Sequence, residues 1–238
     1  MSNPLLPLRV VTHRVRGGAF LIQAVAGSVM IGATLYLTFH LQIVLGMGAL
    51  EAGVASLPLP LGTMVLAGGA TKILGRVGPR PMLIGGPLVV AAALIYLSFI
   101  TPDGNYFVQV APALLVMGMG MAFVFIPLQN VALTGVAPHD AGVASAVTNS
   151  AMQIGGSIGL SIFTAVYAAL VAGHAQVGPA ELTSGYSGVF VAAAVGMLVA
   201  SVIAITMVRG RKEDLLPRGA VEQESHVSSD TETVSLAL

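Results

Sequence analysis

Amide side chains inside long apolar segments are the residues of this chain best suited to hold a small molecule. An amide donates and accepts hydrogen bonds, and in hydrocarbon it costs free energy unless a partner or a watery cavity satisfies it. Because amides recur on the same few segments, we predict that they face a common cavity. The candidates for lining it are Gln23, Gln129, Asn130, Asn149 and Gln153. For each amide taken alone, the alternative is a hydrogen bond between two helices.

The sequence offers few other groups that could carry chemistry. It contains no Cys, which removes disulfides and thiolate chemistry. It also contains no HExxH or GxSxG pattern and no glycine-rich phosphate loop. No carboxylates pair within an apolar segment. We therefore expect no metal, no cofactor and no direct use of ATP, and a membrane enzyme is a weak alternative.

Composition indicates that these residues lie in a lipid environment. Of the 238 residues, 55% are hydrophobic and 8% are charged, and the mean hydropathy is +0.90. A soluble domain carries about 25% charged residues. Charges this scarce cannot cover a water-facing surface, so the lipid bilayer is the expected partner. Nucleic acid is not, because the sequence has no basic stripe or aromatic platform.

Six apolar segments are long enough to cross a bilayer as helices, which takes roughly 20 residues each. They do not alternate with period two, as the strands of a membrane barrel would. The predicted fold is therefore an all-α membrane protein with six transmembrane helices in one bundle. The predicted spans are residues 18–40, 52–74, 82–100, 107–133, 141–170 and 186–208.

The six spans differ in polarity. The third and sixth contain no Asn, Gln, His or charged residue, so we predict that they are peripheral supports. The first, fourth and fifth carry the amides and are predicted to line the cavity. Pro58 and Pro60 predict a bend in the second span.

The basic residues predict the orientation of the bundle. They cluster before the first span, between the second and third, and after the last: Arg9, Arg14, Arg16, Lys72, Arg76, Arg80, Arg209, Arg211, Lys212 and Arg218. The connections around Glu51, Asp103 and Glu181 contain no Lys or Arg. Short cytoplasmic loops carry the positive charge, so we predict a multi-pass plasma-membrane protein with both termini cytoplasmic. Residues 1–17 are then a cytoplasmic segment, 18–208 the bundle, and 209–238 a disordered cytoplasmic tail.

Three stretches of the chain resemble a known family. Residues 39–62 hold Leu-Gln, Val-Leu-Gly and Leu-Glu-Ala-Gly runs before the helix that contains Pro58. Residues 75–80 resemble the loop motif Asp-Arg-x-Gly-x-Arg, with Gly75 in place of the acid. Residues 141–159 resemble a next-to-last span with a face of small residues. In this order and spacing, they resemble the fourteen-span drug:proton antiporters (EmrB/QacA type) of the major facilitator superfamily.

The resemblance implies that the chain forms the carboxy-terminal half of a fold in which two bundles rock around a midplane site. It implies proton-coupled efflux of amphipathic, drug-like molecules, with an amino-terminal half or a second copy of the chain as partner. The five amides would then bind substrate. A gate or loop motif would comprise Gln42, Glu51, Gly75, Arg76, Gly78 and Arg80, and close helix packing would involve Gly142, Ser145, Gly155, Gly156 and Gly159.

Three alternatives stay open at this point. Glu51 is also well placed to cap the second span, because a carboxylate near a helix N-terminus is favourable. The second alternative is that the chain is an inactive truncated fragment. The third is a six-span channel or transporter that associates with itself. Proton coupling needs a titratable group in the membrane, and no span carries one at its centre.

Overall fold

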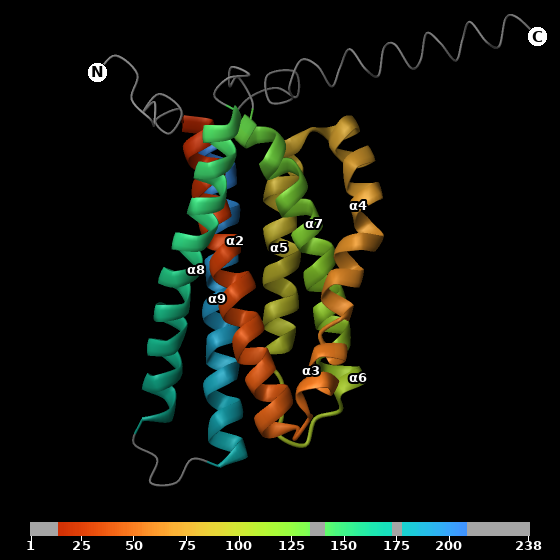
Figure 1. The fold of residues 1–238 in the computed structure, drawn as a ribbon, viewed down its shortest axis with the longest axis vertical. Coiled ribbons are helices and arrows are strands. Elements are labelled where there is room, and N and C mark those ends of the chain that lie inside the picture. The colour runs from red at the N-terminus through yellow and green to blue at the C-terminus, as the bar shows by residue number, and fades with distance from the viewer. Residues whose placement is uncertain (1–13, 134–140, 173–177, 209–238) are drawn as a thin grey trace, which may run out of the picture.

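The structure, a computed structural model, describes residues 14–133, 141–172 and 178–208, and every regular element in these residues is a helix. Six helical segments are long and apolar enough to cross a membrane, which confirms the predicted all-α membrane fold (Figure 1). In chain order the elements are α2 (Arg14–Phe39), η1 (His40–Val44), α3 (Ala49–Ala55), α4 (Pro58–Val77), α5 (Pro79–Leu97), α6 (Tyr106–Gln109), α7 (Ala111–Leu133), α8 (Ala141–Val171) and α9 (Pro179–Met207).

Three of the six spans consist of more than one helix. In the first, α2 continues into η1, which is a short π-helix. The second joins α3 to α4, and the fourth joins α6 to α7. The third, fifth and sixth spans are the single helices α5, α8 and α9.

The spans form two groups of three, which lie side by side in Figure 1. In one group α2 packs against α8 and α9, and in the other α7 packs against α4 and α5. Contacts of α5 with α9 and of α2 with α7 join the two groups. The first span therefore holds the same place in its group as the fourth span does in the other.

The described basic residues gather at one end of the bundle. The start of α2, the end of α9 and the turn between α4 and α5 all lie at this end (Figure 1), where Arg14 Nη2 donates to the Thr206 carbonyl at 3.1 Å. The starts of α3 and α9 and the loop before α6 lie at the opposite end (Figure 1). The predicted separation of charges thus holds for the described residues. Residues 1–13 and 209–238, which include the predicted tail, lie outside them.

Glycine brings α2 and α8 into backbone contact. A Cβ added at Gly155 would meet the backbone of Ala24, and one added at Gly159 would meet Ser28. The Ser28 hydroxyl lies within hydrogen-bond distance of two carbonyl oxygens, 2.9 Å from Ala24 O and 2.5 Å from Gly155 O. Small residues permit this approach, and the resulting dispersion contacts stabilise helix pairs in lipid.

A similar contact joins α4 to α7. A Cβ added at Gly62 would meet the Leu115 carbonyl, and one added at Gly118 would meet the Leu59 carbonyl. The Thr63 hydroxyl lies 3.1 Å from Leu59 O and 3.0 Å from Gly118 O. In each group, then, a hydroxyl beside a glycine bridges the two helices at their closest approach.

The second and fifth spans are the least covered. In the most apolar stretch of each, 17% of the second and 22% of the fifth are buried, against 44% to 56% in the other four spans. The third and sixth spans, predicted to be peripheral, are better covered because α5 packs on α7 and α9, while α9 also packs on α2 and α8. The absence of amides therefore does not identify the least covered helices, and the prediction that the third and sixth spans are peripheral is wrong.

The predicted bend in the second span is a break between α3 and α4. Pro58 and Pro60 have no amide hydrogen, so neither can donate to the carbonyl four residues earlier. Hydrogen bonds that reach back three residues instead of four replace these. The Leu57 amide donates to Val54 O at 3.1 Å, and the Leu59 amide donates to Ser56 O at 3.3 Å. The chain therefore turns tightly where the two helices meet.

The break frees a carbonyl that a tyrosine then satisfies. The amide of Leu59 donates to Ser56 O rather than to Ala55 O. Instead, the Tyr106 hydroxyl at the start of α6 donates to Ala55 O at 2.7 Å. An unsatisfied carbonyl is costly in the membrane, so Tyr106 stabilises the break from the neighbouring span.

We predict that Gly155→Ala lowers the free energy of unfolding by about 1–3 kcal/mol, because the new methyl group has to displace the α2 backbone. The matched control is Gly142→Ala on the same helix, where an added Cβ meets no described atom within 4 Å. This control should be neutral or stabilising by up to about 1 kcal/mol. Denaturant titration of the purified protein in micelles measures both. Equal losses from the two variants would contradict the close contact.

We predict that Tyr106→Phe costs about 1–3 kcal/mol, because it leaves the partly buried Ala55 carbonyl without its donor. The control is Tyr96→Phe, which removes a bond of similar length, 2.8 Å to the Val108 carbonyl, from an exposed site. Water can replace that donor, so its loss should be smaller. The same unfolding titration compares them, and a larger effect at Tyr96 would refute the role given to Tyr106.

Candidate functional site

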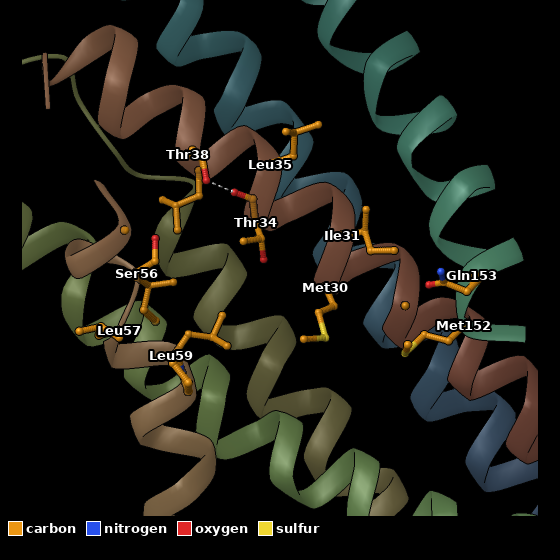
Figure 2. Close-up of a pocket in the computed structure, with 15 residues that line it drawn as sticks. Met30, Ile31, Thr34, Leu35, Thr38, Ser56, Leu57, Leu59, Met152 and Gln153 are labelled. Carbon is orange, nitrogen blue, oxygen red and sulfur yellow. Dashed lines mark hydrogen bonds between the residues drawn. The ribbon is translucent and has the colours of Figure 1, made fainter. Parts of the chain in front are cut away.

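A groove runs between the first and second spans, at the level where α3 meets α4. Its volume is about 630 Å³, which suits a drug-sized molecule. Residues of α2 form one side and residues of α3 and α4 the other, while Leu114 of α7 and Met152 and Gln153 of α8 also border it (Figure 2). The first, second, fourth and fifth spans therefore all contribute to the groove.

Two hydroxyl groups of the groove bond to backbone carbonyls one turn earlier. Thr38 Oγ1 donates to the Thr34 carbonyl at 2.9 Å (Figure 2), and Ser56 Oγ donates to the Ala52 carbonyl at 2.8 Å. Such bonds satisfy the hydroxyl hydrogen and leave lone pairs on its oxygen as acceptors. The groove thus presents weakly polar points rather than charges.

The remaining wall is mostly apolar. Its larger side chains include Met30, Ile31, Leu35, Leu57 and Met152. Apolar walls bind by removing surface from water, and the unbranched, polarizable Met side chain adapts to ligands of different shape. No described residue that lines this groove is titratable. The geometry therefore suits binding of an apolar or amphipathic molecule.

The structure places one of the five predicted amides in the groove. Gln153 lines it, on an exposed face of α8. Gln129 and Asn149 are also exposed but do not line it. Asn130 is half-buried, and its Nδ2 donates to the Ile126 carbonyl of its own helix at 2.9 Å. Within this chain the amides are therefore not gathered around one cavity.

Gln23 differs from the other four amides because it is buried. It is 2% exposed, and its Oε1 accepts no hydrogen bond among the described residues. A buried amide oxygen without a donor costs free energy. Gln23 thus lies inside the bundle rather than on the groove.

Glu51 acts as a helix cap. Its Oε2 accepts a hydrogen bond from the Gly48 amide at 2.9 Å, which satisfies one of the free amides at the start of α3. Glu181 does the same at the start of α9, accepting from the Gly178 amide at 3.0 Å. Gln42, on η1, is exposed. The capping alternative for Glu51 is therefore realised in the structure.

The predicted loop motif forms the turn between α4 and α5. Gly78 has a φ of +81°, which ordinary side chains avoid, so glycine is required there. Arg76 is exposed in the last turn of α4, where a cation is favourable. Arg80 is half-buried, its Nε without a partner among the described residues, and Gly75 is half-buried within α4. The motif lies at the end of the bundle opposite Glu51.

The residues predicted to pack helices closely fall into two sets. Gly155, Gly156 and Gly159 are buried against α2. Gly142 and Ser145 are exposed, and a Cβ added at Gly142 meets no described atom. These two residues do not form part of the α2–α8 contact, because they lie on an uncovered face of α8.

The groove contains residues that the sequence analysis did not single out. Thr34 and Thr38 are four residues apart, which places them on one helix face, and Ser56 precedes two closely spaced prolines. Hydroxyl residues recurring every four positions within an apolar span were the available signal. Within the described residues, no group of three His, Cys, Asp or Glu side chains could hold a metal ion.

Comparison with known proteins identifies the family. Residues 2–160 match the Major Facilitator Superfamily. With six membrane-spanning helices in the described residues, the chain belongs to this superfamily of transporters and is a multi-pass protein of the plasma membrane. The sequence resemblance to the superfamily is thereby confirmed.

The chain is similar to several drug-resistance and export proteins. It is 37% identical over 223 residues to puromycin resistance protein pur8 of Streptomyces alboniger, covering 90% of this chain and 44% of that protein. It is 32% identical over 203 residues to cephamycin export protein CmcT of Amycolatopsis lactamdurans, covering 85% and 41%. It is 27% identical over 221 residues to quinolone resistance protein NorB of Staphylococcus aureus, covering 90% and 44%. The chain spans less than half the length of these relatives.

We predict that Thr34→Cys reacts rapidly with a small maleimide, because its side chain borders the groove. The control is Val29→Cys on the same helix, whose side chain is buried and which should react slowly. Since the chain contains no Cys, each variant reports a single site. Mass spectrometry after timed labelling gives the rates, and comparable rates at both positions would argue against an open groove.

Proposed function

We propose that this chain is one half of a transporter that exports amphipathic, drug-like molecules across the plasma membrane. The observation that carries the proposal is the groove of about 630 Å³ bordered by the first, second, fourth and fifth spans. Transport is favoured over catalysis because the described lining of the groove contains no titratable side chain that could act as an acid, base or nucleophile.

The faces beside the groove suggest a second bundle. On α4, Met64 and Val65 are 73% and 70% exposed, and on α8, Ile154 and Ile158 are 60% and 57% exposed. A bundle docked on both helices would cover these side chains and convert the open groove into a central cavity. Gln129 and Asn149, which this chain leaves exposed, are then candidates for substrate contacts alongside Gln153.

The partner bundle is proposed to be an amino-terminal half, as in the fourteen-span antiporters, with a second copy of the chain as the alternative. In superfamily transporters the two bundles rock around a site near the midplane. Relatives that are longer than the matched region support a further part of the transporter beyond this chain, which the resemblance places at the amino-terminal side. The loop motif with Arg76 and Arg80 would then lie at the cytoplasmic face.

The proposed substrates are molecules with an apolar body and a few hydrogen-bonding groups. The apolar wall would hold the body, while Gln153 and the hydroxyl oxygens of Thr34 and Thr38 would accept or donate hydrogen bonds. The names of the relatives, which refer to puromycin, cephamycin and quinolones, support this class. We further propose that a proton gradient drives export.

A chimera tests the proposal. This chain replaces the matched region of puromycin resistance protein pur8, and puromycin transport is measured in proteoliposomes with and without a pH gradient. We predict transport that depends on the gradient and that falls about tenfold or more, or about 1.4 kcal/mol, when Thr34→Trp fills the groove. The control is Leu88→Trp on α5, which is exposed away from the groove and should leave transport unchanged.

The outcomes separate the parts of the proposal. A correctly inserted chimera that moves no puromycin would contradict a transport role for this chain. Transport that ignores the pH gradient would contradict proton coupling alone. Transport by this chain without any other half would replace the amino-terminal partner with a second copy.

A further inference from the structure

His40 occupies an unusual position at the end of the first span. It is 1% exposed, and its Nδ1 has no hydrogen-bond partner among the described residues. It is also the first residue of η1, the π-helical segment that follows α2. Single π-helical turns are rare and occur frequently at functional sites.

A cluster of tyrosines from three helices contacts His40 through Tyr186. The His40 ring meets Tyr186 of α9 edge to face, with ring centres 6.2 Å apart. Tyr186 stacks on Tyr167 of α8 at 5.5 Å, and Tyr36 of α2 lies within 6.0 Å of both tyrosines. Tyr36 also donates to Thr164 Oγ1 at 3.1 Å. His40 is thus part of the packing that joins the first, fifth and sixth spans.

The carboxylates on the elements packed against η1 are engaged elsewhere. Of the elements packed against η1, α3 carries Glu51 and α9 carries Glu181. Glu51 caps α3 through the Gly48 amide, and Glu181 caps α9 through the Gly178 amide. The titratable side chain with a ring contact to His40 is Tyr186, and no ion pair in the described part of the chain involves His40. A buried imidazolium here would have no counter-ion, which is strongly unfavourable.

We propose that His40 is the residue of this chain that takes up and releases a proton during transport, an inference that rests on the proton coupling proposed above. The unprotonated ring nitrogen accepts a proton from the solution at the end of the bundle opposite the basic clusters, forming an N–H bond and an imidazolium. Because the packed site cannot solvate this charge, protonation favours a conformation in which η1 moves away from α9 and hydrates. Release of the proton restores the packing.

This assignment fits the direction of the proposed exchange. The end that carries His40 is the predicted external end, so an acidic exterior would protonate it and favour opening to that side. Substrate leaves as the site opens to the exterior. When the transporter then closes to that side, the imidazolium gives its proton to water on the cytoplasmic side of η1, and this release restores the packing of η1 on α9. No described span carries a titratable group at its centre, and His40 supplies one at the end of the first span instead.

The first experiment measures whether η1 opens with acid, using the full chain in lipid nanodiscs. Leu41→Cys places a thiol at a buried site in η1, and Ile43→Cys places one at an exposed site in the same segment. Dividing the labelling rate of Leu41→Cys by that of Ile43→Cys removes the effect of pH on thiol reactivity, which both sites share. We expect this ratio to rise about fivefold or more between about pH 8 and pH 5, where histidine titrates. Adding His40→Gln should abolish the rise.

A second measurement needs no change at His40. The chain has no Trp and five Tyr, so its near-ultraviolet circular dichroism reports tyrosine packing, including the cluster beside His40. This signal should fall reversibly with acid when His13, His139, His174 and His226 are all replaced by Gln. A constant signal, or a labelling ratio that rises in spite of His40→Gln, would overturn the proposal.

The pur8 chimera separates this inference from the proposed function. Transport should lose its dependence on the pH gradient when the chimera carries His40→Gln. If that variant keeps gradient-driven transport, the role of His40 is wrong and proton coupling stands. If the unsubstituted chimera already ignores the gradient, proton coupling itself is wrong.

Discussion

The bundle depends on one constraint, which is that polar backbone and side-chain groups must find partners inside the protein when lipid surrounds it. Hydroxyls along the spans meet this constraint by bonding to carbonyls one turn earlier, as Thr38 and Ser56 do. Ser28 and Thr63 also reach a carbonyl on a neighbouring helix, where Gly155 and Gly118 permit close approach. The same constraint explains why a tyrosine from the next span serves the carbonyl that the proline break exposes. Little polar capacity then remains for the groove, whose wall is accordingly apolar.

The groove and the uncovered faces belong to a single arrangement. The closely packed pairs α2–α8 and α4–α7 place the two least covered helices on either side of the groove. The proposed half-transporter would need this geometry, because it would have to be rigid within itself and incomplete at the surface where the proposed partner docks. At the end of the bundle where α3 and α9 begin, His40 of η1 is buried beside the tyrosine cluster. The described basic residues lie at the opposite end, so the groove, the His40 site and the basic turn between α4 and α5 occupy separate levels of the bundle.

Element type and the membrane-spanning segments of the described residues could be predicted from this sequence, because length and apolar content alone determine which segments can span a bilayer. The proline break and the glycine contact at Gly155 were also visible as local signals. The direction of individual side chains was not, since it depends on the rotation of each helix within the bundle. Gln23 consequently faces the interior, Gly142 faces outward, and Thr34 and Thr38 reach the groove. The π-helical turn at His40 has no sequence signature that distinguishes it from the helix before it.

Six crossings with the basic end in the cytoplasm are the premise of both the groove's role and the path of the proton. Single-cysteine labelling of intact cells with a membrane-impermeant maleimide tests this most directly, at two exposed positions. Asp103→Cys, in the loop before α6, should be labelled from outside, whereas Arg76→Cys, beside the α4–α5 turn, should react only after the membrane is permeabilised. Labelling of Arg76→Cys in intact cells would contradict the topology and, with it, the transport account.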